Sequence, residues 1–332
     1  MMESVLNAIT VTLYCDEIVN VRLEDDILGG EPEYWDYIGI LAVPESKREA
    51  LLKKLLNARC LNPDNEVWEG CESRCRWHDD NNTEVHYTDL DDTKKYKIAC
   101  SWVDLLIQNG KRNWDLIYFY ILGLNRSKLD LERFGPANQQ NRDVTIYNRF
   151  FRTAVQKSTK SFFHRFDLII VENVYHDVGS EQDHEYFPWH VVWKLGWEDE
   201  KLNFNCNEIA FISSDHRKSD GDPVHSHFIQ FIDLLLGSTF NILHYASGNP
   251  NKVDIALRAK ELLGDRLIGR PNNKNSRYHY FGRQRIEFFP RENLSSYDAD
   301  SIVYRMKRMD NFYTGRELRI GRRLQPVLLM SK

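Results

Sequence analysis

Apolar positions along the chain fall into two kinds of segment. Some form continuous runs of strand length, which is the pattern of strands buried on both faces of a sheet. Others are longer and repeat at helical spacing, with polar residues between them. This alternation predicts an α/β fold in which helices cover a sheet. The predicted strands are 9–15, 34–43, 84–88, 116–122, 168–174 and 209–213, and the predicted helices are 46–56, 94–108, 143–155 and 228–236.

Three of the apolar runs lead into acidic residues. Asp16 and Glu172 follow two such runs directly, and Asp215 comes three residues after another. Ligands of α/β proteins bind at the carboxyl ends of parallel strands, so these acids are candidates for a functional site. Glu17 points to the face opposite Asp16 if the backbone stays extended, and only one of the pair then joins the site. The alternative is that the acids begin turns or cap helices, which suits Asp215 best.

Asp233 lies in a segment, 228–237, that is apolar on nearly every side of the predicted helix. A lone buried carboxylate costs on the order of several kcal/mol unless it is protonated, paired or bound to a metal. A salt bridge to an Arg elsewhere in the chain is the structural alternative to a metal. Glu84 and His86 share one face of the strand predicted around them, and both side chains suit a divalent metal. Together the acids would form the oxygen-rich environment that Mg²⁺ or Mn²⁺ prefers.

Three short motifs contain these residues: Asp16-Glu17, Glu84-Val85-His86 and Gln230-Phe231-Ile232-Asp233-Leu234. Together they resemble the prokaryotic domain of unknown function 3800 family, which is similar to the ribonuclease H fold, over roughly residues 9–240. The resemblance implies a ribonuclease H-like mixed sheet flanked by helices. It also implies a metal-dependent nuclease or a relative of one, of the kind often encoded among mobile-element and defence genes. On the matching positions it nominates Asp16, Glu84 and Asp233, with Asp215 near the family's Asp-Ser pair.

Two positions depart from the family pattern. Ile18-Val19 replaces the Ser-Gly that family members have after Asp-Glu, and Glu172 stands where they more often have Asp. The hypothesis is hydrolysis of phosphodiester bonds in RNA or DNA by two metal ions about 4 Å apart, one activating water and the other stabilising the leaving oxygen. The alternative is a catalytically inactive module that binds nucleic acid or protein, with the acids as structural remnants. The predicted ligands are Asp16, Glu84, Asp215 and Asp233, with Glu172 in reserve.

The composition is that of a globular protein, with 42% apolar and 12% aromatic residues, and it excludes a disordered chain. The net charge of −5, taken alone, argues against a nucleic-acid partner. Its distribution changes that conclusion. Residues 252–332 contain 18 Lys and Arg against 9 Asp and Glu and carry +9, whereas the other 251 residues carry −14. We therefore predict a domain at 1–244, with an inserted loop at about 60–82, and a basic C-terminal extension at 245–332.

Aromatic residues are interleaved with the cations of the basic extension. Cations contact phosphates and rings stack on bases, so this pattern predicts a nucleic-acid surface. A solvated helix face, or a contact with the acidic domain of the same chain, explains the pattern as well. A protein partner or a homo-oligomer is also compatible with it. The candidate nucleic-acid contacts are Arg277, Tyr280, Arg283, Arg285, Arg319, Arg322 and Arg323.

The six cysteines are too few and too scattered for a disulfide framework in a chain of this length, so reduced thiols are expected. Cys60, Cys71, Cys75 and His78 have a spacing that structural zinc sites allow. The signal is weak because a second close pair is missing. Ordinary thiols in the inserted loop are the simpler interpretation.

Two further segments contain residues that could form a site. His225 is a candidate for proton transfer, although an exposed helix start is the commoner role for such a residue. Residues 176–190 contain acids and histidines that could bind a metal, but a polar loop that enters a helix is the simpler interpretation. No stretch approaches the ~18 consecutive apolar residues of a membrane span, and the first residues lack the basic and apolar regions of a secretory signal. We therefore expect a cytoplasmic protein with no membrane contact.

Overall fold

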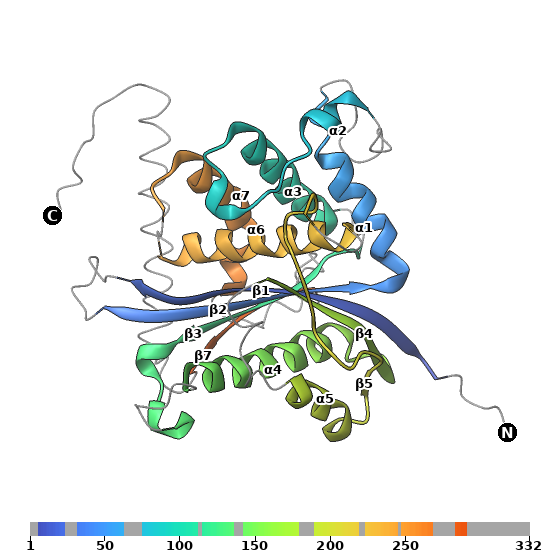
Figure 1. The fold of residues 1–332 in the computed structure, drawn as a ribbon, viewed down its shortest axis with the longest axis vertical. Coiled ribbons are helices and arrows are strands. Elements are labelled where there is room, and N and C mark those ends of the chain that lie inside the picture. Colours follow the sequence, from blue (N-terminus) through green and yellow to red (C-terminus); the bar gives the residue numbers. More distant parts are fainter. Residues whose placement is uncertain are drawn as a thin grey trace.

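The computed structural model shows an α/β domain in which a seven-stranded mixed sheet has helices on both faces (Figure 1). The predicted fold class is confirmed at this level, a mixed sheet flanked by helices. Within the described residues, no helix is both long and apolar enough to cross a membrane. The residues that the structure describes are 6–23, 32–62, 75–111, 115–135, 142–178, 189–218, 223–244, 247–267 and 283–290.

The centre of the sheet is formed by two long strands, β1 (Ala8–Leu23) and β2 (Glu33–Pro44), which pair in antiparallel orientation. The other strands are β3 (Tyr118–Asn125), β4 (Leu168–Asp177), β5 (Leu202–Phe204), β6 (Ala210–Ile212) and β7 (Gln284–Phe289). Their order is β5-β4-β1-β2-β3-β7, and β6 also pairs with β4. β2 and β3 are antiparallel, whereas β4 is parallel to β1, β5 and β6, and β7 is parallel to β3.

Helices cover the two faces of the sheet unequally. The helices are α1 (Glu45–Ala58), α2 (Arg76–Asp80), α3 (Thr93–Lys111), α4 (Arg142–Phe163), α5 (Trp189–Glu198), α6 (Val224–His244) and α7 (Pro250–Leu267), and the short 3-10 turns are η1 (Tyr87–Asp89), η2 (Arg126–Lys128) and η3 (Leu131–Phe134). α1, α3, α6 and α7 lie on one face, and α4 and α5 lie on the other (Figure 1). Each layer of helices packs against the sheet and forms a separate hydrophobic core, one around Trp102 and Phe231 and the other around Phe151 and Phe163.

Several elements extend beyond their predicted limits, and one is not formed. β1 does not end before Asp16 but continues to Leu23, because it goes on pairing with β2. β4 likewise continues past Glu172 to Asp177. The predicted strand 84–88 is irregular backbone that leads into η1. The predicted helix 228–236 is confirmed as the centre of the longer helix α6, and its residues are buried on every side as expected.

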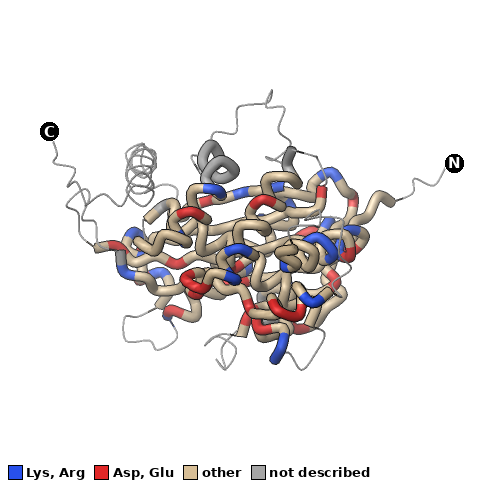
Figure 2. Tube along the Cα trace, turned by 90° about the horizontal axis from the view of Figure 1, so that it is seen from above, with Lys and Arg blue, Asp and Glu red and all other residues tan. Residues whose placement is uncertain are grey.

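The described parts of the predicted basic extension pack into the same unit as the rest of the chain. α7 packs against α6 and α3, and β7 pairs with β3 from Phe119–Gln284 to Leu124–Phe289. The predicted boundary after residue 244 therefore falls between two helices that contact each other. Basic and acidic positions are interspersed along the described trace (Figure 2).

Candidate functional site

β1 places Asp16 and Glu17 on opposite faces of the sheet, as predicted. Asp16 is 7% exposed and lies on the same face as Tyr14, which belongs to the core under α6. Glu17 lies on the face of α4, where its Oε2 is 2.9 Å from His176 Nε2. The Tyr147 hydroxyl also donates a hydrogen bond to Glu17. Of the two acids, only Asp16 faces α6.

The end of β4 contributes Asp177, not the predicted Glu172. The parallel register with β1 passes from Val171 to Asn173 and leaves Glu172 in a bulge. The Glu172 carboxylate accepts a hydrogen bond of 2.7 Å from Asn205 and has no part in the site around Asp16. Asp177 ends the strand, and its Oδ1 accepts a hydrogen bond of 3.0 Å from the backbone N–H of Ser214.

Helix α6 brings Asp233 to the same region. Its side chain is almost fully buried, at 7% exposure, and it accepts a hydrogen bond of 2.7 Å from the backbone N–H of Tyr87. His86 Nε2 lies 3.5 Å from the other carboxylate oxygen. Among the described residues, the contacts of this buried acid are thus a backbone amide and an imidazole and not the Arg of the structural alternative, and the metal stays a prediction.

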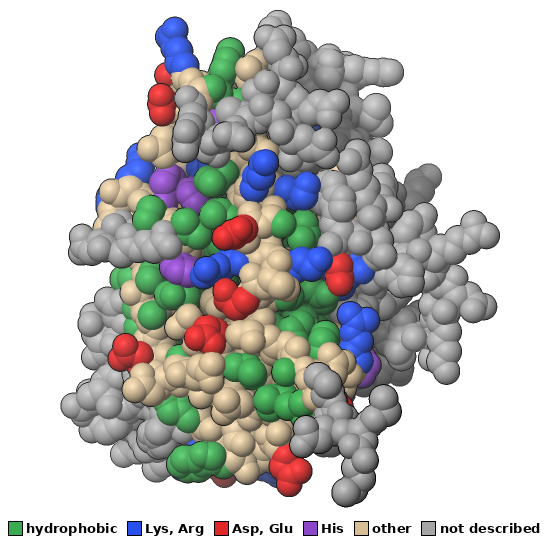
Figure 3. All heavy atoms as spheres, turned by 90° about the vertical axis from the view of Figure 1, so that its right-hand side faces the viewer, with side chains coloured by type: hydrophobic (Ala, Val, Ile, Leu, Met, Phe, Trp, Pro, Cys, Tyr) green, Lys and Arg blue, Asp and Glu red, His purple; other side chains and the backbone are tan. Residues whose placement is uncertain are grey.

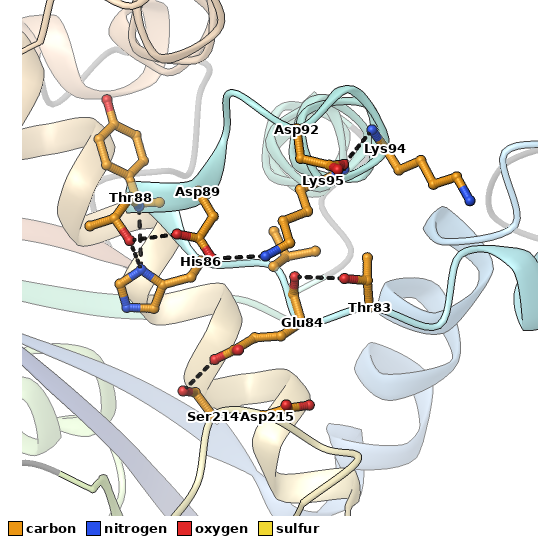
Figure 4. A network of polar contacts seen from close by, with 12 residues as sticks. Thr83, Glu84, His86, Thr88, Asp89, Asp92, Lys94, Lys95, Ser214 and Asp215 are labelled. Carbon is orange, nitrogen blue, oxygen red and sulfur yellow. Dashed lines mark hydrogen bonds and ion pairs between the residues drawn. The ribbon is translucent and has the colours of Figure 1, made fainter.

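Glu84 approaches the site from the irregular segment before η1. Its Oε1 accepts a hydrogen bond of 2.8 Å from the Ser214 hydroxyl, and Figure 4 shows the two side chains pointing toward each other. The buried Gln230 of α6 fixes both segments, because its amide donates to the Ser214 carbonyl at 2.5 Å and its oxygen accepts from the Val85 N–H at 3.0 Å. α6 therefore holds Ser214 and the segment of Glu84 in place. Ser214 in turn donates hydrogen bonds to both Glu84 and Asp177.

Asp215 does not join this group. Its carboxylate is 2% exposed and forms a bidentate ion pair with Arg217, with Nε–Oδ1 and Nη2–Oδ2 distances of 2.8 and 2.9 Å. Lys218 Nζ lies 3.1 Å away. These cations lower the pKa of the Asp215 carboxyl, with hydrogen bonding from Arg217 as the largest cause. The prediction of Asp215 as a ligand is therefore replaced by a role in holding two cations, and its neighbour Ser214 contacts the site instead.

We call Asp16, Glu84, Asp177 and Asp233 the carboxylate cluster. Burial raises the pKa of Asp16 well above its usual value, and the charges of Asp233, Glu17 and Asp177 raise it further. Burial also raises the pKa of Asp233 to about 7, with Asp177 and Glu84 acting in the same direction. Neighbouring acids thus make ionisation of Asp16 and of Asp233 more costly, which is the electrostatic condition that a bound cation relieves.

A histidine supplies part of the counter-charge from the other face of the sheet. Burial alone would lower the pKa of His176, but the Glu17 carboxylate outweighs it and raises the pKa to about 9. His176 is held further by the Tyr147 hydroxyl at 2.7 Å. Glu17 therefore neutralises most of the charge on His176, and His176 does little to neutralise the carboxylate cluster.

The carboxylate cluster is not a compact single-ion site. Among the described residues, one group of three or more His, Cys, Asp or Glu side chains has ligand atoms that all lie within 4.8 Å of one another. That group is Cys60, Cys75 and His78, and it contains none of the four acids. Cys71, the remaining residue of the predicted zinc set, lies outside the described residues. The acids interact electrostatically in pairs, and Ser214 links Glu84 to Asp177 through hydrogen bonds.

The predicted nucleic-acid contacts are only partly described, and those that are described already have partners. Arg283 is 8% exposed, and its Nε lies 2.6 Å from Asp115 Oδ1. Arg285 is exposed but pairs with Glu287 and donates to the Ser161 hydroxyl at 3.1 Å. On the face shown in Figure 3, coloured acidic and basic side chains are intermixed and form no extended basic patch. Arg277, Tyr280, Arg319, Arg322 and Arg323 lie outside the described residues.

Asp177 and Ser214 are the site residues that the sequence did not reveal. Asp177 was assigned to a polar loop, although it stands one register position beyond the last residue of β4 that pairs with β1. His225, a candidate for proton transfer, is buried, with its Nδ1 2.9 Å from the Tyr14 hydroxyl and its ring stacked on Tyr175. It is a packed core residue and not an exposed helix start.

Comparison with known proteins leaves the geometry as the ground for a functional assignment. No protein-family model matches the chain, and no curated protein matches it. The resemblance based on the three motifs therefore stays a prediction from the sequence.

Proposed function

We propose that the carboxylate cluster binds Mg²⁺ or Mn²⁺ and that the chain is a metal-dependent nuclease with a ribonuclease H-like domain. One observation carries the proposal: Asp16 and Asp233 are buried on separate elements, Asp233 raises the cost of ionising Asp16, and Asp177 and Glu84 raise that of Asp233. Folding alone gains nothing from such an arrangement, whereas a divalent cation would stabilise all four carboxylates.

The sheet is compatible with the ribonuclease H-like part of the proposal. Three antiparallel strands lead along the chain into a strand, β4, that lies parallel to β1. Asp16 and Asp177 stand just past the last parallel pair, Cys15 and His176. Acids at this point of a parallel pair occupy the place where α/β proteins bind ligands.

The donor set suits hard cations. Mg²⁺ and Mn²⁺ prefer carboxylate oxygens, and the cluster offers four carboxylates. Ions about 4 Å apart need ligands spread over a wider region than one ion does, which agrees with acids that interact in pairs. When bound, the ions would lower the pKa of an attacking water and stabilise the leaving oxygen of a phosphodiester.

The chain's own residues would bind the ions and orient the ligands. Asp16 and Asp233 are fixed by β1 and α6 and would be the central ligands. Ser214 orients both Asp177 and Glu84 by donating from its backbone and its hydroxyl. Such outer partners hold ligand oxygens in place and tune their basicity.

Two cations beside the site suit a phosphate backbone. The side chains of Arg217 and Lys218 are 45% and 74% exposed, and both are held by the buried Asp215. Arg217 is also within electrostatic reach of Glu84. Exposed cations on a fixed turn next to an acidic site contact phosphates without reading sequence. This turn replaces Arg283, which is buried, as the proposed contact for substrate.

A second candidate function is the non-catalytic binding module. Within the described residues, the donor atoms of the carboxylate cluster do not all lie within 4.8 Å of one another, and this favours it. In that case the acids would fix the fold, and binding would depend on cations and salt concentration.

Mn²⁺ titration of the full-length chain, followed by nuclease assays on single- and double-stranded RNA and DNA, tests the proposal. We expect Asp16→Asn and Asp233→Asn to weaken Mn²⁺ binding at least as much as the roughly 10- to 100-fold loss caused by removing outer partners, and to abolish hydrolysis. Affinity should also rise from pH 6 to pH 8, because the Asp233 carboxyl, with a pKa of about 7, must ionise to bind.

The two acids of β4 provide a matched pair of variants. Asp177→Asn should lose Mn²⁺ affinity and activity, whereas Glu172→Gln, on the same strand but outside the cluster, should keep both. Wild-type Mn²⁺ binding in Asp16→Asn and Asp233→Asn would show the metal site to be wrong. Mn²⁺ binding without hydrolysis of any substrate would leave the metal site in place and favour the binding module.

A further inference from the structure

A second cluster of metal-ligand side chains lies outside the carboxylate cluster. Cys60 follows the end of α1, Cys75 caps the start of α2, and His78 lies within α2. The Cys60 and Cys75 sulfur atoms are 3.4 Å apart, and Cys75 Sγ is 3.5 Å from His78 Nδ1. Cys60 and His78 are 3% and 9% exposed, and Cys75 is partly buried. We propose that these three side chains bind a structural zinc ion.

The spacing of the three donor atoms matches a tetrahedral ion. Zinc lies about 2.3 Å from thiolate sulfur and about 2.0 Å from imidazole nitrogen, so tetrahedral angles place two sulfurs about 3.8 Å apart and a sulfur and a nitrogen about 3.5 Å apart. The observed separations of 3.4 and 3.5 Å are close to these values. No disulfide joins Cys60 to Cys75, because their sulfurs stand well beyond the roughly 2.05 Å of such a bond.

A hydrogen bond on the far side of the imidazole fixes the ring for metal binding. His78 Nε2 lies 2.7 Å from the backbone carbonyl of Leu56. A carbonyl oxygen only accepts, so Nε2 carries the proton and Nδ1 presents its lone pair to the sulfurs. This is the arrangement in which a metal-bound histidine donates its other N–H to a backbone carbonyl.

The chemistry of the ligands selects zinc over the ions proposed for the carboxylate cluster. Thiolates and imidazole are soft or intermediate donors and bind Zn²⁺ in tetrahedral geometry, whereas Mg²⁺ and Mn²⁺ take oxygen ligands. The described part of the chain supplies three of the four ligands that a tetrahedral zinc ion takes. The two sites would therefore be filled by different metals and can be tested separately.

The zinc site would connect α1 to the segment that carries Glu84. The Cys60 carbonyl accepts a hydrogen bond of 3.3 Å from Asn81, and Arg59 donates to the Thr83 carbonyl at 2.6 Å. A zinc ion between Cys60 and α2 would add a strong link at the start of this connection. Structural zinc contributes directly to folding free energy, so its loss should loosen the segment between α2 and η1.

Metal analysis of the full-length chain, expressed with zinc supplementation and purified without chelator, tests the proposal. We expect about one zinc per chain in the wild type, and less than about a tenth of that in Cys60→Ser, Cys75→Ser and His78→Gln. Cys206→Ser, which changes a partly buried cysteine far from the cluster in sequence, should keep its zinc. A chelator should lower the unfolding temperature of the wild type but not that of Cys60→Ser.

X-ray absorption of the wild-type protein keeps the test independent of how well the variants fold. Two sulfur ligands at about 2.3 Å from zinc would support the site. A shell made only of oxygen and nitrogen, a chain purified without zinc, or a Cys60–Cys75 disulfide detected by mass spectrometry would overturn it.

Discussion

The imidazoles of His216 and His227 lie against each other beside the carboxylate cluster, with ring centroids 4.5 Å apart. Burial and the nearby Arg59 cation lower the pKa of both, that of His216 to about 4. His216 Nδ1 is 3.1 Å from the Gln230 amide nitrogen, and Nε2 is 2.5 Å from the Asn82 side-chain oxygen. The neutral ring, with its proton on Nε2, satisfies both contacts. A protonated ring would place two donors against each other at Gln230.

We expect His216 to destabilise the fold as the pH falls from 6.5 to 4. An unfolded histidine binds a proton near pH 6.5 and the folded one only near pH 4, so the unfolded state binds more protons in this interval and acid favours unfolding. Because the side chain is partly exposed, screening reduces the effect to about 1–2 kcal/mol. Urea unfolding of the wild type and of His216→Gln at pH 7 and pH 5 measures it. Equal losses in the two chains would contradict this role.

The site residues differ in how far the sequence could identify them. Asp16 could be predicted because it directly follows an apolar run of strand length. Asp233 could be predicted because it lies within an apolar helix, where an unpaired buried charge needs a partner. Asp177 was not predicted as a site residue because Glu172 is the first acid after the apolar run. A bulge keeps Glu172 out of the site, and that bulge depends on the pairing of β4 with β1. Whether Ser214 or Asp215 contacts the site depends on a turn that Arg217 stabilises. The spacing of residues in the sequence does not predict that turn.

At the scale of elements, the close approach of η1 to α6 depends on Gly237. A Cβ atom there would lie 2.2 Å from Tyr87 Cγ, which forces the ring to move. Tyr87 is also the residue whose backbone N–H donates to Asp233. We expect Gly237→Ala to cost about 1–3 kcal/mol of unfolding free energy, as overpacking does, and to weaken Mn²⁺ binding. Calorimetry and Mn²⁺ titration measure the two effects.

A neighbouring substitution on the same helix gives the control. Ser238 is also buried, and its hydroxyl bonds only to the Leu234 carbonyl one turn earlier. Ser238→Ala should lose about 1 kcal/mol at most and leave Mn²⁺ affinity unchanged. If Gly237→Ala binds Mn²⁺ like the wild type, η1 does not control the position of Asp233.

The centre of α6 could be predicted from the sequence but the limits of β1 could not, for a physical reason, and the helices α5 and α7 were not predicted at all. α6 follows from a local apolar pattern, and its buried centre is enough to define it. The limits of β1 instead depend on β2, because the ladder continues through Asp16–Gly39 and Glu17–Ile38 into a region with polar residues. The segment 84–88 has strand-like residues, but α6 supplies its hydrogen bonds through Gln230 and Asp233, so no strand forms.

At the scale of the whole molecule, the split between an acidic part and a basic part is a property of the sequence more than of the fold. Arg283 pairs with Asp115, and Arg258 on α7 pairs with Asp104 on α3. Some described cations of the basic region thus pair with acids of the preceding domain, as the alternative explanation for that region expects, whereas Arg285 pairs with Glu287 of the region itself. The cations in residues 268–282 and 291–332 lie outside the described residues.

Two truncated chains separate the structural part of the C-terminal region from the part expected to bind nucleic acid. A chain ending at residue 290 keeps β7, and we expect it to unfold like the full-length protein. A chain ending at residue 282 exposes the edge of β3, whose eight residues are all buried, and should lose at least about 3 kcal/mol and aggregate. Equal stability of the two chains would show that β7 does not complete the sheet. If Arg319, Arg322 and Arg323 contact phosphates, the 290-residue chain should bind nucleic acid more weakly than the full chain, and its affinity should depend less steeply on salt. Its Mn²⁺ affinity should equal that of the full chain.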